Sequence, residues 1–281
     1  MQKNILITGA SSGIGADAVR TLIAQGFTVV ATVRKSEDEI RLSEVYGEKI
    51  KVLRLDLTDL SEIEKIPGLL KQKFGIEQLY GLLNNAGVAL AAPFAQQQFA
   101  EIQEIIQLNV LSVMKLTQVL LPLLKSGSRI VNISSVAGKN AAPFLAIYAA
   151  SKHAIEGFSE AIRKEFILLG IKVILVAPGS IKTPIWKKGF EVIKDVYKQS
   201  VFAEPFSRFM RIAQNAERNA LDVSVVSADI LAAFTVEHPK VRYAPIPNRF
   251  ANWYLPMLIP TKMYDYLSAK TLGLLPKQAE D

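Results

Sequence analysis

The stretch Ile5-Leu6-Ile7-Thr8-Gly9-Ala10-Ser11-Ser12-Gly13-Ile14-Gly15 joins an apolar run to three glycines in the spacing Gly-x3-Gly-x-Gly. We interpret the apolar run as a buried strand and the glycines as a tight turn into a helix that ends at Gly26. A second strand over 27–33 completes a β-α-β unit. Glycines let backbone N–H groups approach a ligand, and a helix start favours an anion, so this turn suits a pyrophosphate. A turn that needs glycine only for steric reasons is the alternative.

Size and composition narrow the class of protein. With 281 residues, half of them hydrophobic, the chain can form one large α/β domain or two small ones. The absence of Cys excludes disulfides and thiolate metal sites, and only His153 and His238 are available as imidazole ligands, so we expect no metal. The net charge of +7 comes from scattered residues without a nucleic-acid motif, which favours a basic enzyme over a nucleic-acid binder.

The ends and the hydropathy of the chain bear on its location. The first residues show no basic segment followed by a long apolar run, so no secretory signal is visible. We also find no apolar stretch of the ~18 residues expected of a spanning helix. The sequence therefore predicts a cytoplasmic protein, with association to a membrane left open.

Two cations follow the second predicted strand. Arg34 and Lys35 occupy the place that faces the adenine ribose in dinucleotide folds, where Arg accommodates a 2′-phosphate and an acidic residue would bind the 2′-hydroxyl. We therefore predict NADP(H) rather than NAD(H). The alternative is that both are loop charges, because the acidic segment 37–39 is close by.

Polar and small residues also follow the next strands. Asp56 comes after a strand over 51–55, where it can accept from an adenine amino group or cap a helix that begins near Ser61. A strand over 79–83 leads into Asn84-Asn85-Ala86-Gly87. Residues of these types let the chain pass close to a flat ligand while the amides bond neighbouring strands.

Two helices carry further candidates. Apolar residues at helical spacing predict a helix over 99–124, and Asn109 lies on its apolar stripe. A buried amide must be hydrogen-bonded, since leaving it unpaired costs ~1–3 kcal/mol. A second helix, over 148–169, places Tyr148 and Lys152 on one face because they are four residues apart.

The order of these segments predicts the fold class. Two more strands, over 129–133 and 172–176, precede Ser134-Ser135 and Pro178-Gly179. Alternating strands and helices predict an α/β, doubly wound parallel sheet with helices on both faces. Ligands bind such sheets outside the carboxyl ends of the strands, which is where the flagged polar residues gather.

Tyr148 and Lys152 together suggest acid–base chemistry. A free Tyr has a pKa of ~10, and a nearby cation favours the phenolate, so Lys152 and a positively charged nicotinamide would lower the phenol pKa. Tyr148 would then be a general acid or base, and Ser135 would donate a hydrogen bond to a developing alkoxide. Asn109 would hold the Lys152 ammonium through a water. The alternative is a half-buried aromatic beside a solvated lysine.

Over residues 3–184 the chain resembles the short-chain dehydrogenase/reductase family. The resemblance rests on motifs that occur in order along the chain: Thr8-Gly9-Ala10-Ser11-Ser12-Gly13-Ile14-Gly15, Asn84-Asn85-Ala86-Gly87, Asn109, Ser135, Tyr148-x3-Lys152 and Pro178-Gly179. It implies a sheet of about seven strands and hydride transfer between NAD(P)(H) and an alcohol or carbonyl. Ser135, Tyr148 and Lys152 would be the catalytic residues, with Asn109 completing the set.

The resemblance also implies the cofactor contacts and the assembly. The expected cofactor-binding residues are Gly9, Ser11, Ser12, Gly13, Ile14, Gly15, Arg34, Lys35, Asp56, Leu57, Asn85, Ala86, Gly87, Tyr148, Lys152, Pro178, Gly179, Ile181 and Thr183. Ser12 departs from the Lys or Arg of many NADP-preferring members, so Arg34 and Lys35 must contact the 2′-phosphate. Members often form dimers or tetramers through helices that correspond to 99–124 and 148–169.

The last third differs in character. We assign residues 1–240 to the catalytic domain, with 185–220 as a substrate flap, and 241–281 to an aromatic, Pro-rich extension. Four aromatic residues would surround an apolar substrate if the flap folds over it: Phe144, Trp186, Phe190 and Phe202. The extension resembles that of steroid- and retinol-dehydrogenase-like members. We favour its packing on its own domain or on a second subunit over a membrane interface.

These observations support one leading hypothesis and three rivals. The leading one is an NADP(H)-dependent oxidoreductase acting on a lipid-, steroid- or retinoid-like carbonyl or alcohol. The rivals are a 3-oxoacyl-thioester reductase, a reductase that modifies lipids at a membrane surface, and a non-catalytic dinucleotide sensor that recruits a partner through its tail. Turnover on a carbonyl panel separates the sensor from the enzymes.

Overall fold

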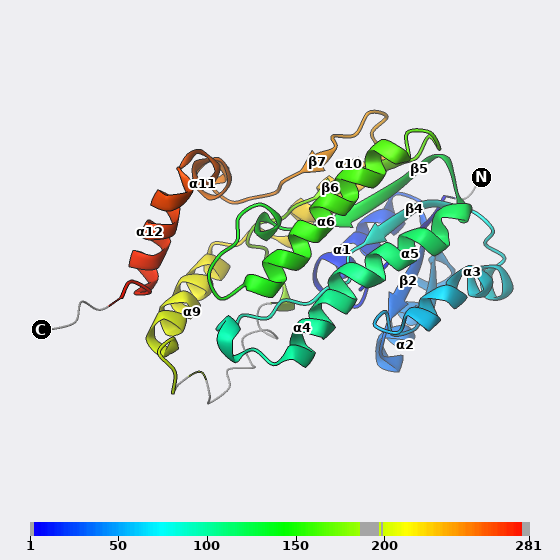
Figure 1. Cartoon of the computed structure of the whole chain (residues 1–281). Helices are drawn as coiled ribbons and strands as arrows, with labels where there is room; N and C mark the ends of the chain where they lie inside the picture. Colours follow the sequence, from blue (N-terminus) through cyan, green and yellow to red (C-terminus); the bar gives the residue numbers. More distant parts are fainter. Residues whose placement is uncertain (1–2, 186–196, 198, 277–281) are drawn as a thin grey trace, which may run out of the picture.

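The computed structural model describes residues 3–185, 197 and 199–276 and is organised around one parallel sheet (Figure 1). Its seven strands lie in the order β3-β2-β1-β4-β5-β6-β7. The strands are β1 (Asn4–Ile7), β2 (Thr28–Val33), β3 (Ile50–Arg54), β4 (Leu79–Asn84), β5 (Leu124–Ile133), β6 (Lys172–Val176) and β7 (Arg242–Tyr243). The predicted α/β class and doubly wound sheet are confirmed. The sheet includes β7, so it continues past residue 240, where we placed the end of the catalytic domain.

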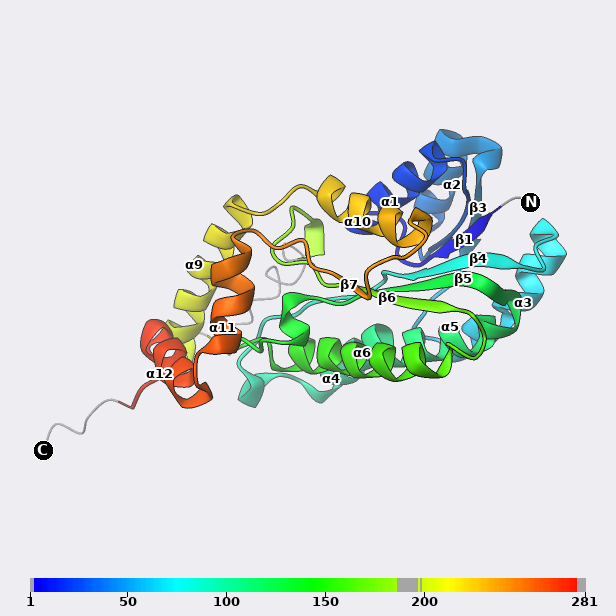
Figure 2. The same cartoon turned by 90° about the horizontal axis from the view of Figure 1, so that it is seen from above.

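Helices cover both faces of the sheet (Figure 2). One face carries α1 (Gly13–Ala24), α2 (Ser36–Tyr46) and α10 (Val223–Thr235), and the other carries α3 (Leu60–Phe74), α4 (Phe99–Ile106), α5 (Ser112–Leu120) and α6 (Ala146–Glu165). Buried aliphatic side chains fill the space on each side, which is why β2 is buried along its whole length. Strands covered on both faces are continuous apolar runs, as residues 5–7 and 28–33 are.

The strand order sets the position of the site. From β1 the chain passes to β2 on one side, whereas β4 pairs with β1 on the other side. Loops that leave β1 and β4 therefore diverge to opposite faces and leave a crevice at their carboxyl ends. Such a reversal point is where open α/β sheets bind ligands.

The helix predicted over 99–124 is interrupted by a π-helical segment, η3 (Gln107–Leu111), which contains Asn109. Residues Phe99–Leu123 are long and apolar enough to span a membrane by length and composition, with a mean hydropathy of 1.4. Our expectation that no stretch reaches that length was therefore wrong. Leu116 and Leu120 from this segment are buried in the core beneath the sheet, so we interpret it as a core helix.

The C-terminal helices gather at the end of the molecule opposite the N-terminus (Figures 1 and 2). They comprise α9 (Ala203–Arg218), the π-helical segment η6 (Phe250–Tyr254), α11 (Leu255–Leu258) and α12 (Thr261–Leu272). Leu272 is buried in a cluster with Phe144 and Phe206, and the Asn140 side-chain amide donates to the Tyr264 hydroxyl at 2.9 Å. The extension thus packs on its own chain, one of the two arrangements that the sequence favoured.

Candidate active site

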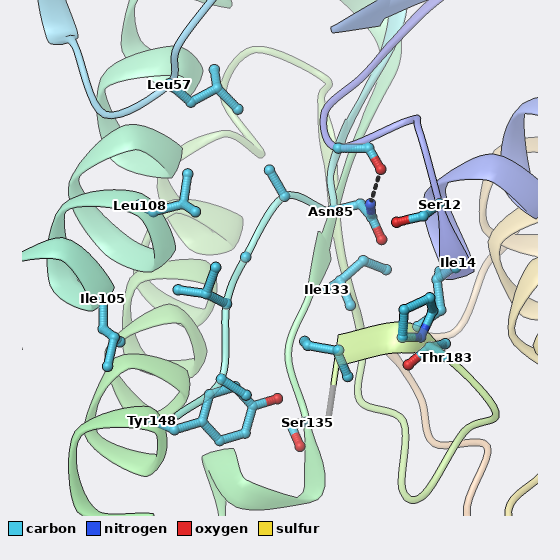
Figure 3. Close-up of a pocket in the computed structure, with 18 of the residues that line it drawn as sticks. Ser12, Ile14, Leu57, Asn85, Ile105, Leu108, Ile133, Ser135, Tyr148 and Thr183 are labelled. Atoms are coloured by element: carbon cyan, nitrogen blue, oxygen red, sulfur yellow. Dashed lines mark hydrogen bonds between the residues drawn. The ribbon is translucent and has the colours of Figure 1, made fainter. Parts of the chain in front are cut away.

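A cavity of about 560 Å³ lies at the carboxyl ends of the central strands (Figure 3). It runs from the glycine turn to Tyr148 and Ser135, and most of the predicted site residues line it. Three do not: Gly15 is buried in the glycine turn, Lys35 is the exposed N-cap residue of α2, and Asn109 is buried in η3. One continuous cavity therefore joins the predicted dinucleotide and catalytic ends.

The glycine turn lets its backbone pack closely against neighbouring segments and against a ligand. Gly9 has a φ of +65°, and a Cβ there would lie 2.9 Å from the Ala86 Cα. A Cβ on Gly15 would overlap the Gly9 carbonyl oxygen and lie 2.5 Å from Asn85 Nδ2. Among described residues, the Ser12 side chain makes no capping hydrogen bond to α1, so the helix start presents N–H groups toward the cavity. This arrangement fits a pyrophosphate.

Thr8 locks the turn to the neighbouring loop, a role that the sequence analysis did not assign. Its hydroxyl accepts hydrogen bonds from the backbone N–H groups of Asn85 and Ala86, at 2.9 and 3.0 Å. In return, Asn85 Nδ2 donates to the carbonyl of Thr8 and to that of Gly9, the second bond being drawn in Figure 3. A hydroxyl directly after an apolar strand was the available signal. The predicted bonding of amides between strands is thus present.

At the ribose end, two different aspartates occupy the positions for the two roles, ligand contact and helix capping, that the sequence left open for Asp56. Asp56 lines the cavity and accepts from the backbone N–H and hydroxyl of Thr58, whereas Asp59 caps α3 by accepting from the Ser61 N–H. Asp56 is therefore not the N-cap residue, because the chain turns for three more residues before the helix starts. The exposed Arg34 side chain also lines the cavity.

Arg41 is a further cation near this end that the sequence analysis missed. Its guanidinium donates to the Ser11 carbonyl at 2.9 Å and to the Asp38 carboxylate at 2.7 Å. It therefore ties α2 to the glycine turn. It lies seven residues beyond Arg34, inside a helix, where strand-end reasoning does not look.

At the other end, Tyr148 and Ser135 share a hydrogen bond, and the phenol oxygen points toward the serine (Figure 3). Burial raises the pKa of the Tyr148 phenol, and the bond with Ser135 works against that rise. The Lys152 ammonium lies 5.8 Å from the centroid of the Tyr148 ring and donates to the Ile133 carbonyl at 2.9 Å. Burial lowers the pKa of Lys152 to about 8, and the Glu156 carboxylate opposes the fall.

These shifts bear on one expectation. We expected Lys152 and a positively charged nicotinamide together to lower the phenol pKa, whereas in the protein without its cofactor burial raises it. The same desolvation acts on the ammonium, so both groups favour their neutral forms more than in water. The Lys152 ammonium and the Tyr148 ring lie close together on α6, as the helical spacing predicted.

Asn109 does not bond Lys152 with its side chain. Its amide oxygen accepts from the Val88 N–H at 2.9 Å, and its amide nitrogen donates to the Val88 carbonyl and to the Ser151 hydroxyl. The contact that we expect between Asn109 and the Lys152 ammonium runs through a water, and it stays a prediction. The Asn109 amide holds the segment that follows Gly87 against α6, and its own hydrogen-bonding groups are thereby satisfied, as the sequence required.

The substrate side of the cavity differs from the expected aromatic box. Phe144 packs on Phe206 and Phe209, with ring centroids 5.3 and 5.6 Å apart, and Phe202 joins this cluster rather than the cavity wall. Trp186 and Phe190 lie outside the described residues. The same cavity is lined by small and aliphatic side chains and by two carboxylates from α4, of which Glu104 also borders Arg34 and Asp56 at the ribose end: Ala89, Leu90, Ile105, Leu108, Ile185, Glu101 and Glu104. Helical periodicity located α4 but did not show which face borders the cavity.

Comparison with known proteins agrees with this geometry. The family model described as "short chain dehydrogenase" matches residues 3–193. An NADPH-dependent 3-dehydrocapnine reductase of Ornithobacterium rhinotracheale is 33% identical, covering 98% of this chain and 99% of its own. Mouse 17-beta-hydroxysteroid dehydrogenase type 6 is 31% identical over 99% of this chain and 90% of its own.

Among solved structures, ElxO with NADP bound superposes with a TM-score of 0.72 at 26% identity, covering 89% of this chain and all of that one. The relatives carry reductase and dehydrogenase names and match nearly the full length of the chain. The nicotinamide cofactor follows from the same relatives and from the fit of the glycine turn. The protein is therefore an oxidoreductase and belongs to the short-chain dehydrogenase family.

Proposed function

We propose that this protein is an NADP(H)-dependent oxidoreductase for an apolar carbonyl or alcohol, with Tyr148 as the general acid or base. The observation that carries the proposal is the shared cavity: the Tyr148 hydroxyl, bonded to Ser135, faces the same space as the glycine turn. The remaining predicted cofactor residues that line this cavity would hold the dinucleotide between these two ends.

The bound cofactor supplies or accepts the hydride, and the protein handles the proton. In the reducing direction the Tyr148 hydroxyl donates its proton to the carbonyl oxygen, which becomes the alcohol. Ser135 donates a hydrogen bond to the same oxygen as negative charge develops on it. The Lys152 ammonium stabilises the phenolate that remains, which solvent then reprotonates.

The preference for NADP(H) rests on Arg34. Its side chain lines the cavity beside Asp56 and Thr58, at the place where a ribose 2′-phosphate would lie. Lys35, which does not line the cavity, is the weaker candidate. One relative is an NADPH-dependent reductase, and ElxO holds NADP, which supports the same choice.

The apolar wall favours an apolar substrate. Ile105, Leu108 and Leu90 offer apolar surface beside the carboxylates of Glu101 and Glu104, and one relative is named for a hydroxysteroid. A panel of ketones, steroids, retinoids and acyl thioesters, followed at the nicotinamide absorbance with both cofactors, tests the proposal. Preference for the acyl thioester would favour a 3-oxoacyl-thioester reductase, and binding of cofactor without turnover on any compound would favour a dinucleotide sensor.

We further propose that a face of the C-terminal extension rests on an anionic membrane. Met263, Tyr266 and Leu267 lie at helical spacing on α12, are about half exposed, and are flanked by Lys262 and Lys270. The opposite face of α12 packs on the protein. A cytoplasmic protein with such a face would bind reversibly.

Two measurements test these assembly proposals. The protein should co-sediment with anionic vesicles, less with zwitterionic ones, and a Met263→Glu, Leu267→Glu variant should lose that binding. A homodimer or homotetramer through α4–α5 and α6, as the family implies, should be seen by light scattering. A mass that falls to the monomer in the same double variant would assign the α12 face to a second copy instead.

A further inference from the structure

A buried carboxylate lies one helical turn beyond Lys152. Glu156, on α6, is 4% exposed, and both its oxygens accept from the guanidinium of Arg242, with an Nη1–Oε1 distance of 2.7 Å. The Lys139 ammonium lies 3.9 Å from the same carboxylate. Burying a charged group without a partner is energetically costly. The contacts with Arg242 and Lys139 are therefore what allow this carboxylate to be buried.

Glu156 does not line the cavity, so it cannot contact the substrate or the dinucleotide directly. Glu156 nevertheless lies against both segments that carry the proposed catalytic residues, α6 and the turn that follows Ser135. A Cβ on Gly138, in the turn η5 (Val136–Gly138) that follows Ser135, would lie 2.9 Å from Glu156 Cγ and 3.1 Å from the Lys152 carbonyl. Glycine at this position lets the serine-bearing turn pack directly on α6 at Glu156.

We propose that Glu156 is a positioning residue that keeps Lys152 charged, and that Arg242 moderates its effect. The inference deepens the proposed function and rests on it, because the charge on Lys152 matters only if Tyr148 transfers a proton. The buried ion pair of Glu156 and Arg242 would thus act on the reaction through Lys152, without taking part in it directly.

The charges around Lys152 give the sign of each effect. Burial favours the neutral amine, the Ile133 carbonyl favours the ammonium, and the Glu156 carboxylate also favours it. Among the described residues, Arg242 from β7 and Lys139 just after η5 pair with Glu156, and the cavity that Lys152 lines also carries the titratable Tyr148, Glu101 and Glu104. Removing the carboxylate leaves the two cations unopposed, whereas removing Arg242 leaves the carboxylate with the more distant Lys139.

The ion pair of Glu156 and Arg242 also connects the proposed active site to the C-terminal extension. The Arg242 guanidinium lies over the ring of Trp253 in η6, 6.0 Å from its centroid. Trp253 is buried, so it limits where the guanidinium can lie. Movement of the extension would thereby change how closely Arg242 neutralises Glu156.

The test compares Glu156→Gln with Arg242→Gln. Glu160→Gln is the matched control, because Glu160 pairs with Lys164 on the exposed side of the same helix. The Lys152 titration is followed by NMR of ¹³C-labelled lysine in the cofactor-free protein, with Lys152→Met identifying the signal. The pH profile of kcat/KM for carbonyl reduction is measured in parallel.

We expect Glu156→Gln to move the Lys152 midpoint and the alkaline limb of activity down by about one pH unit. Arg242→Gln should move both up, and Glu160→Gln should leave both unchanged. A merely structural pair would give shifts of the same sign in both variants. If Glu156→Gln fails to fold, the upward shift in Arg242→Gln, with return toward the parent midpoint in Arg242→Lys, decides the question.

An unchanged midpoint in folded Glu156→Gln, or shifts in the same direction for both variants, would overturn the inference. The titration needs no turnover, so it fails or succeeds separately from the proposed reaction. Loss of activity on every carbonyl, with the expected titration shifts intact, would refute the proposed function and leave the electrostatic pair standing.

Discussion

Replacing Asn109 with Ala tests whether its buried side-chain amide stabilises the fold or takes part in proton transfer. In the structure the side chain makes three hydrogen bonds, two to Val88 and one to Ser151. The Ser151 hydroxyl keeps its bond to the Tyr148 carbonyl, so only the two Val88 groups lose their partners. At ~1–3 kcal/mol for each unpaired group, and with Val88 partly accessible to water, we expect a loss of about 2–4 kcal/mol in the free energy of unfolding.

That loss is a large fraction of an ordinary stability and should lower Tm by about 3–7 °C. The released segment borders the cavity through Gly87 and Val88, so NADP(H) affinity should fall together with Tm. Calorimetry and cofactor titration measure the two quantities, and Asn219→Ala, an exposed asparagine, is the control. A variant with normal Tm and normal cofactor affinity but reduced kcat would refute this reasoning, because it would place Asn109 in the proton-transfer step.

Three further predictions address the cavity. Gly15→Ala forces a Cβ into the Gly9 carbonyl and should weaken NADP(H) binding about tenfold or more, whereas Gly157→Ala, which has open space, should not. Arg34→Asp should reverse the ratio of kcat/KM for NADP(H) and NAD(H), and an unmoved ratio would show that Arg34 does not select the cofactor. Because the pKa of Lys152 is about 8 and the ammonium is the active form, kcat/KM for reduction should fall as pH rises through 8, to about one tenth of its plateau one unit above. A flat alkaline profile to pH 10 would contradict that assignment.

The position of the site was predictable because it depends on strand ends. Each apolar run ends at one edge of a parallel sheet, so residues such as Asp56, Asn85 and Ser135 had to meet there once the β-α-β order was recognised. The pairing of Tyr148 with Lys152 follows from helical spacing alone. These inferences need only local periodicity and one rule of topology.

The rest depended on contacts between segments that lie far apart in the chain. Nothing local shows that Phe144 packs on Phe206 rather than on the substrate, since both environments are apolar. The partner of Arg242 is Glu156, 86 residues earlier in the chain, and no periodicity relates the two. In the cofactor-free protein burial raises the pKa of Tyr148, and sequence spacing does not show how deeply a phenol is buried.

The proposed function requires the Tyr148 hydroxyl to transfer a proton in the cavity that would also hold the dinucleotide. Tyr148→Phe removes only that oxygen, so the most direct measurement is reduction of the best substrate by this variant alongside titration with NADPH. We expect turnover to fall by about 10²–10⁴-fold while the NADPH dissociation constant stays within a few-fold of the parent. Retained turnover in the variant would contradict the proposed function.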